Sequence, residues 1–421
     1  MSNYLFRANK IFGRIEELSR FSEDENSLTR LFGTKSFIDC SAKIVEWMDE
    51  AGLATHTDSI GNIRGKLASK NTNAKTFVIA SHFDTTLNAG KFDGVMGILS
   101  GLDIAESIIQ QNLDLPFHLE IIAFSTEEGA RFHAAYVGSS VIAGTFDNRL
   151  LQQKDDKGIS MHEVLESLNL DPAQIENNKI PEEEWLGYLE IHTEQGPVLY
   201  EKNVSVGIVS AIAGQKKIEI IFRGESGHAG TVPMNMRTDA LCAAAQFIVA
   251  VEEYASDDKR NMVATVGKIN VENPVSNIIP ASVFCTLDIR SSNASSLSKV
   301  YEAINKMCEA ICHKRKIYFE WKLVQESAPS ACDVALLSML SKSIKRKNIE
   351  VVKMVSGGGH DAVAISRVSP VAMLFVKCYK GISHSPLENV EVEDIAAAID
   401  VADNFIMQVA DTEVRANNNL Y

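Results

Sequence analysis

The chain has 421 residues, 45% of them hydrophobic and 23% charged, with a formal net charge of −14. This length suggests two or three domains with a sizeable core, and the composition is that of an ordinary globular protein. The excess of negative charge argues against a nucleic-acid-binding protein, which needs a basic face. No apolar run approaches the roughly 20 residues of a membrane-spanning helix, so we expect no membrane partner.

The N-terminal segment is expected to form an amphipathic helix, because its apolar residues recur at helical spacing. Charges at Arg7, Lys10 and Arg14 interrupt any apolar stretch there, so we do not expect a signal peptide. The seven cysteines are odd in number and scattered along the chain. This pattern favours a reduced, cytoplasmic protein.

The first half of the chain alternates short apolar runs with helical stretches. The predicted strands are residues 77–80, 119–124 and 188–191, and the predicted helices between them are residues 95–109 and 134–143. This alternation is typical of an α/β sheet with helices on its faces.

The pattern changes near residue 210. Polar and apolar residues alternate in two predicted strands, residues 216–223 and 282–290, which indicates an antiparallel sheet with one wet face. Predicted helices at residues 237–255 and 295–313 accompany them. After about residue 327 the α/β pattern returns, with strands at 349–355 and 371–376 and a final helix at 396–409.

The domain prediction follows from these changes of pattern. Residues 1–210 and 327–421 are expected to form one α/β domain with a mixed sheet covered by helices. Residues 211–326 are expected to form an α+β domain inserted into it.

Four polar clusters follow apolar runs in the α/β part. They are His82, Asp84 and Asp93; Glu127 and Glu128; His192, Glu194 and Gln195; and His384. Ligand sites in open α/β sheets lie beyond the carboxyl ends of the strands. Each cluster alone is typical of a turn, but together they supply ligands for two divalent ions bridged by a carboxylate. Imidazole with carboxylate suits zinc, manganese, cobalt or nickel.

Spacing within the clusters suggests roles. His82 and Asp84 face the same side of an extended chain, so Asp84 is placed to accept the second ring N–H of a ligating His82. Asp93 follows after a glycine-bearing turn and is placed to bridge the ions. Glu127 and Glu128 are adjacent and point in different directions, so one binds metal while the other remains a base for a two-metal reaction.

Seven motifs between residues 81 and 388 resemble those of the M20 metallopeptidase family. The resemblance is closest to its amidohydrolase branch, which contains N-carbamoyl-L-amino acid hydrolases, allantoate amidohydrolases and β-ureidopropionases. The motifs are SHFDTTLNAGKFDG, FSTEEGARF, EIHTEQGPVL, GHAGTVPM, NIIPASVFCTLDIR, SGGGHDA and GISHSPLE.

The resemblance implies a role for each matching residue. The implied metal ligands are His82, Asp93 as the bridge, Glu128, His192 and His384. Glu127 matches the general base and Asp84 the orienting aspartate. The inserted domain resembles a lid and dimerisation domain, so a homodimer is expected. His228 matches a residue that stabilises the oxyanion, and the implied substrate-binding residues are Gln195, His228, Asn277, Arg290 and Gly359.

The implied activity is a metal-dependent hydrolysis of a ureido or carbamoyl C–N bond, which releases ammonia, and CO2 from carbamoyl amino acids. Three alternatives remain: an aminoacylase or dipeptidase that cuts an ordinary amide, a β-ureidopropionase, and a metal-dependent binding protein without activity. His192 and the following EQGP pattern argue against the first, and the complete ligand set argues against the last. The sequence leaves open which ureido carboxylate and which metal the chain uses.

Overall fold

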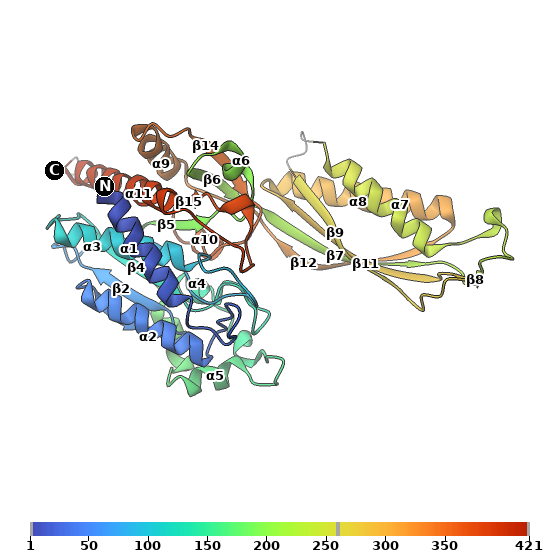
Figure 1. The fold of residues 1–421 in the computed structure, drawn as a ribbon, viewed down its shortest axis with the longest axis horizontal. Helices are drawn as coiled ribbons and strands as arrows, with labels where there is room; N and C mark the ends of the chain where they lie inside the picture. The colour runs from blue at the N-terminus through green and yellow to red at the C-terminus, as the bar shows by residue number, and fades with distance from the viewer. Residues whose placement is uncertain (1–2, 258–261, 419–421) are drawn as a thin grey trace. The chain divides into compact units, whose positions relative to one another are not determined.

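The computed structural model describes residues 3–257 and 262–418. The chain forms two compact units, one made of Met1–Ser210 with Cys332–Tyr421 and the other of Ala211–Ala331. Figure 1 shows that the chain leaves the first unit once and returns to it. The second unit ends at Ala331, whereas the predicted inserted domain ends at residue 326.

The first unit is built on a large mixed sheet, which confirms the predicted fold class (Figure 1). The strand order is β1-β2-β4-β3-β5-β15-β6-β13, and β14 pairs with β6. The strands are β1 (Ala54–Thr57), β2 (Ile63–Leu67), β3 (Thr76–His82), β4 (His118–Phe124), β5 (Trp185–Thr193), β6 (Val206–Ile212), β13 (Ser330–Ala331), β14 (Val352–Ser356) and β15 (Val371–Val376). The four central strands β4, β3, β5 and β15 are parallel.

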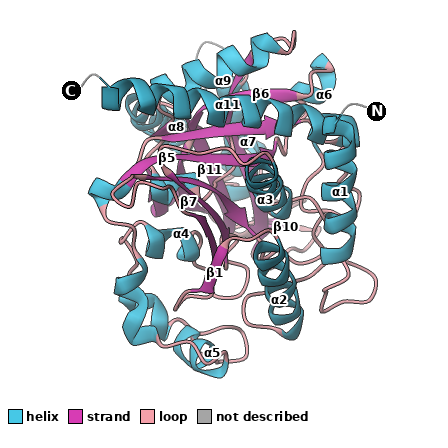
Figure 2. Ribbon diagram, turned by 90° about the vertical axis from the view of Figure 1, so that its left-hand side faces the viewer, coloured by secondary structure: helices cyan, strands magenta, loops and turns pink. Residues whose placement is uncertain are grey.

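Helices cover both faces of this sheet, as its continuously buried central strands require. Figure 2 shows α2 and α3 on one side of the strands and α4 on the other. The helices of this unit are α1 (Asn3–Leu18), α2 (Lys35–Glu50), α3 (Val95–Gln110), α4 (Val137–Ile142), α5 (Met161–Ser167), α6 (Val198–Lys202), α9 (Val334–Arg346), α10 (Ala362–Ile365) and α11 (Val392–Asn418). Within the described residues, none of the helices combines the length and apolar character needed to cross a bilayer.

The second unit has a four-stranded antiparallel sheet in the order β12-β7-β11-β9. Buried and half-buried residues alternate along β7 and β11, as the sequence pattern predicts. Its elements are β7 (Gly214–Arg223), β8 (Gly227–His228), α7 (Ala240–Ala255), β9 (Met262–Val271), β10 (Ile278–Ile279), β11 (Ser282–Ser291), α8 (Ala294–Arg315) and β12 (Tyr318–Ser327). Apolar residues of α7 and α8 pack on the buried face of the sheet.

Some element boundaries differ from the predicted ones. The helix predicted from residue 134 begins at Val137, because Tyr136 adopts a left-handed backbone conformation with φ of 59°. The strand predicted over residues 349–355 is β14, and the final helix is longer than predicted at both ends.

The start of α3 packs directly against the strand that carries His192. A Cβ atom on Gly97 would overlap the carbonyl oxygen of Ile191 in β5 and would lie 2.9 Å from the Cβ of Ser81. Because close-packed interiors tolerate little added volume, this helix depends on glycine at that point.

We therefore expect Gly97→Ala to lower the free energy of unfolding by about 1–3 kcal/mol, because the added methyl group forces α3 away from the sheet. Gly13→Ala is the matched control, since Gly13 also lies inside a helix but has no atom within 4 Å of an added Cβ. It should leave stability unchanged or raise it by up to about 1 kcal/mol. Urea unfolding of the two variants measures the difference, and equal midpoints would contradict the packing argument.

Candidate metal centre

The predicted polar clusters meet at one edge of the mixed sheet. His82 is the last residue of β3 and His192 lies near the end of β5, while Glu127 and Glu128 follow β4. His384 follows β15. Because β4, β3, β5 and β15 are parallel, their carboxyl ends lie at the same edge.

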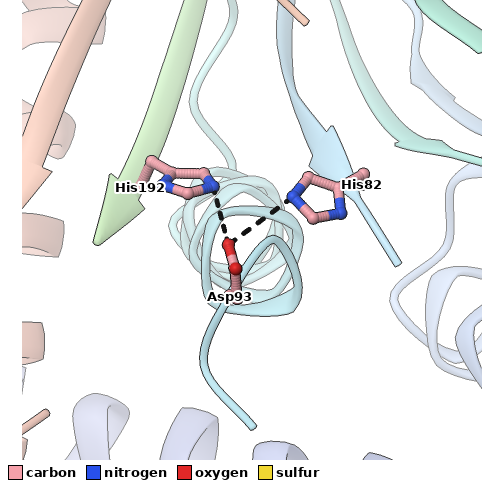
Figure 3. A group of neighbouring side chains, drawn as sticks. All are labelled: His82, Asp93 and His192. Atoms are coloured by element: carbon pink, nitrogen blue, oxygen red, sulfur yellow. Dashed lines mark ion pairs between the residues drawn. The ribbon is translucent and has the colours of Figure 1, made fainter. Parts of the chain in front are cut away.

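Asp93 lies at the middle of this cluster, just before α3. Its Oδ1 is 3.0 Å from Nε2 of His192 and 3.6 Å from Nε2 of His82 (Figure 3). Its Oδ2 is 3.2 Å from Nε2 of His384, which also lies 3.4 Å from Oε1 of Glu128. Each oxygen of one carboxylate therefore faces a different group of potential metal ligands: His82 with His192, and His384 with Glu128.

The hydrogen bonds of the two buried histidines fit a metal between these side chains. Nδ1 of His82 is 3.1 Å from the backbone carbonyl oxygen of Asp84, and Nδ1 of His192 is 2.9 Å from that of Thr193. A carbonyl only accepts, so each Nδ1 carries a hydrogen, and on a neutral ring the Nε2 lone pair faces Asp93. Within the described residues, the buried Oδ1 of Asp93 has no hydrogen-bond donor. A cation between these lone pairs satisfies all three groups.

The carboxylates of this cluster favour protonation of the histidines beside them. Burial lowers the pKa of His82 and of His192, but the carboxylates around them outweigh it and raise both values above the usual range. Hydrogen bonding to Asp93 raises the pKa of His384 to about 9. The three imidazoles in turn hold the pKa of Asp93 well below its usual value despite its burial.

Asp84 faces His82 with both its backbone and its side chain. Nδ1 of His82 is 3.1 Å from the backbone carbonyl oxygen of Asp84 and 3.4 Å from the nearer carboxylate oxygen. The same carboxylate also accepts the backbone N–H groups of Glu127 at 2.9 Å and of Glu128 at 3.3 Å. Because β3 ends at His82, the alternation of an extended strand no longer fixes the direction of the Asp84 side chain.

The two adjacent glutamates lie in different surroundings. Glu127 is buried, and burial raises its pKa well above the usual value, with the charges of Glu128 and Asp361 adding to the effect. Burial and the charge of Asp93 raise the pKa of Glu128 to about 7. Only Glu128 belongs to the group formed with Asp93 and His384, while both glutamates adjoin His82.

Two predicted substrate-binding residues lie in the same unit. Gln195 has a left-handed backbone with φ of 56°, and its Nε2 donates to Oδ2 of Asp93 at 3.1 Å. The loop of three glycines at residues 357–359 lies next to Gln195, since a Cβ on Gly358 would lie 3.2 Å from Oε1 of Gln195. A Cβ on Gly359 would overlap the hydroxyl of Tyr136, so this position requires glycine.

The other three predicted site residues lie in the second unit, and they are not all brought together there. His228 in β8 is close to Asn277, whose carbonyl oxygen accepts the N–H of Ala229 at 2.8 Å. Arg290 lies near the other end of β11, where it hydrogen-bonds the carboxylate of Asp288. The stretch of β11 from Ser282 to Arg290 spans roughly 26 Å at about 3.3 Å per residue.

Two buried residues beside the cluster were missed by the sequence prediction. Glu190, His192 and His360 form a further group of potential ligand atoms. Glu190 accepts the hydroxyl of Tyr188 at 3.0 Å and the N–H of Ala362 at 2.9 Å. The i, i+2, i+4 spacing of Tyr188, Glu190 and His192 places them on one face of β5, and this signal is readable in the sequence.

Imidazole and carboxylate groups thus converge at the carboxyl ends of the four parallel strands of the mixed sheet, next to a buried glutamate with a raised pKa. This combination defines the class of metal-dependent hydrolases.

Comparison with known proteins gives the family. Residues 71–408 match the model of peptidase family M20/M25/M40, and the chain belongs to this family. It is 36% identical to allantoate deiminase 1 of Glycine max, over 91% of this chain and 86% of the relative. It is also 36% identical to an N-carbamoyl-L-amino-acid amidohydrolase of Pseudomonas sp. (strain NS671), over 90% of this chain and 93% of the relative.

A solved structure has the same fold. It is an amidase of the hydantoinase/carbamoylase family from Burkholderia multivorans, with 29% identity and a TM-score of 0.89, and the match covers 96% of this chain and 98% of that one. These relatives identify the chain as a hydrolase of carbon–nitrogen bonds other than peptide bonds.

The raised pKa values of the three histidines predict that metal binding depends on pH. A proton must leave each ring nitrogen before a metal can bind, so the affinity for Mn²⁺ should rise as the pH increases from 6 to 8. This whole range lies below the pKa of His384, which is about 9. Calorimetric titration of the metal-free protein at several pH values, in buffers with different heats of ionisation, measures the affinity and the protons released. A His133→Asn variant should behave like the wild type, because that exposed ring lies outside the ligand groups. An affinity independent of pH would contradict the protonation described above.

Proposed function

We propose that the chain is a two-metal amidohydrolase that cleaves the carbamoyl C–N bond of N-carbamoyl-L-amino acids or allantoate and releases ammonia. The observation that carries this proposal is the arrangement around Asp93, whose two oxygens face two separate ligand groups. The names of the relatives support the substrate class, since they act on allantoate and on N-carbamoyl-L-amino acids.

In this proposal Asp93 would be shared by two divalent ions. His82 and His192 would hold one ion, and Glu128 and His384 would hold the other. Bound there, the ions would supply polarisation of the scissile carbonyl and a lowered pKa of the attacking water. Zinc, manganese, cobalt and nickel all suit these ligands.

Glu127 is proposed as the general base. Its buried carboxylate takes the proton of the attacking water and returns it to the leaving nitrogen. Asp84 holds the backbone of Glu127 and Glu128 and so fixes where both carboxylates lie. Gln195 and the backbone of Gly359 bind the substrate. With an N-carbamoyl amino acid, the released carbamate then decomposes to CO2 and ammonia.

The second unit is proposed as a lid and dimerisation domain. His228 stabilises the oxyanion, and Asn277 and Arg290 bind the carboxylate end of the substrate, Arg290 through its planar fork. His228 and Arg290 lie near opposite ends of one sheet, too far apart for both to contact one small substrate. We therefore propose that the chain forms a homodimer in which His228 and Asn277 act in the site of the other copy.

Loss of the proposed base should abolish turnover but not metal binding. We expect Glu127→Gln to lower kcat by about 10²–10⁴-fold, because the amide cannot accept the proton of the attacking water. Metal analysis of the same variant should show two ions per chain, as in the wild type. Wild-type turnover by Glu127→Gln on every active ureido substrate would rule out the mechanism.

A substrate panel tests the proposed substrate class. Ammonia release from N-carbamoyl-L-amino acids, N-carbamoyl-β-alanine and allantoate is measured with each of the four metals, beside dipeptides and N-acyl amino acids as ordinary amides. The ureido compounds should give the higher kcat/KM. Faster cleavage of the ordinary amides would favour an aminoacylase or dipeptidase instead, and no cleavage with two bound ions would favour a binding protein.

Mixing two inactive variants tests the shared site. His228→Ala and Glu127→Gln are each expected to be inactive. A heterodimer of the two contains one site with both intact residues, so random exchange should restore about a quarter of the wild-type activity. Light scattering establishes the dimer, and mixing Glu127→Gln with itself provides the control. Failure to recover activity in a confirmed heterodimer would exclude His228 from acting across the dimer.

A further inference from the structure

A buried carboxylate connects two loops of the metal centre that are almost 300 residues apart. Glu388 is 3% exposed and lies in the loop after β15, four residues beyond His384. Its Oε1 accepts the backbone N–H groups of Phe92 at 2.8 Å and of Asp93 at 3.1 Å. Its Oε2 accepts the hydroxyl of Ser383, the residue before His384, at 3.2 Å.

The turn before Asp93 is shaped to receive this carboxylate. A Cβ atom on Gly90 would overlap the Cδ of Glu388 and would lie 2.5 Å from its Oε1. The turn therefore needs glycine at residue 90 so that the Glu388 side chain can reach the two backbone N–H groups.

We propose that Glu388 is the positioning residue for the second metal ion, because it fixes the loops that carry Asp93 and His384 relative to each other. The inference rests on the proposed function, in which these two side chains bind that ion with Glu128. The two oxygens of Glu388 accept three hydrogen bonds from the two loops, so a single side chain joins them. Groups that orient metal ligands in this way typically change metal affinity by about 10–100-fold when they are removed.

A second carboxylate accepts two backbone N–H groups elsewhere in the centre. Asp84 accepts the backbone N–H groups of Glu127 and Glu128, as Glu388 does for Phe92 and Asp93. His82 and His192 need no such support, because each belongs to a strand of the sheet. Carboxylates that accept backbone N–H groups thus hold the ligands that come from loops.

The test is the zinc affinity of Glu388→Ala and Glu388→Gln, measured by competition with a chromophoric chelator. The alanine variant should bind the second ion about 10–100-fold more weakly than the wild type does. In this variant the first ion, held by His82 and His192, should be bound more tightly than the second. The glutamine variant should recover much of the affinity, because its amide oxygen still accepts the N–H groups of Phe92 and Asp93. Circular dichroism confirms that each variant is folded.

Glu163→Ala is the matched control. Glu163 accepts the backbone N–H and the hydroxyl of Ser160, both at 2.7 Å, at the start of α5. Its hydrogen bonds are of the same kind as those of Glu388, but it belongs to none of the ligand groups. This variant should lose some thermal stability and bind both zinc ions as the wild type does.

Unchanged affinity for both ions in folded Glu388→Ala would overturn the inference while leaving the proposed function intact. A wild-type protein that binds fewer than two ions at saturating zinc would overturn both. If Glu388→Ala does not fold, the zinc affinities of Gly90→Ala and Ser383→Ala test the inference instead. Each of these variants disturbs a contact of Glu388 while leaving Glu388 itself in place. Weaker binding of the second ion in either variant supports the inference, and wild-type binding in both overturns it.

Discussion

The arrangement of the metal centre depends on one buried carboxylate that is surrounded by the ring nitrogens of three imidazoles. Asp93 cannot remain charged in the interior without compensation. The raised pKa values of His82, His192 and His384 favour protonated rings that compensate it, and the same side chains form candidate ligand groups for divalent ions. The surrounding sheet, loops and hydrogen bonds hold these four side chains so that each Asp93 oxygen faces its own group of ligands.

This constraint explains why ligands on strands and ligands on loops are held in different ways. The parallel strands β3 and β5 place His82 and His192 directly, and backbone carbonyls next to them fix the hydrogens on the two rings. Asp93, Glu127 and Glu128 come from loops, so their backbone N–H groups need acceptors of their own. Asp84 and Glu388 supply these acceptors. A change at either carboxylate therefore acts on the centre through the loops that carry its ligands.

Much of the fold is readable from the sequence, since a parallel sheet buried on both faces gives continuous apolar strands and a half-exposed sheet gives alternating ones. The hydrophobic pattern did not predict features that depend on the backbone conformation of a single residue. The left-handed Tyr136 delays the start of α4, and the end of β3 at His82 brings the backbone carbonyl of Asp84, as well as its carboxylate, next to the His82 ring. The predicted domain boundaries and residue roles stay predictions.

The sequence by itself determined the family, the mixed sheet and the residue types that meet at its carboxyl edge, because these depend on local patterns and on motif order. Only the tertiary structure showed that Asp93 divides its two oxygens between two ligand groups, that Glu388 joins the loops of Asp93 and His384, and that His228 and Arg290 lie near opposite ends of one sheet. These relations join residues far apart in the chain, and distances between such residues are set by packing and hydrogen bonding that no local pattern contains.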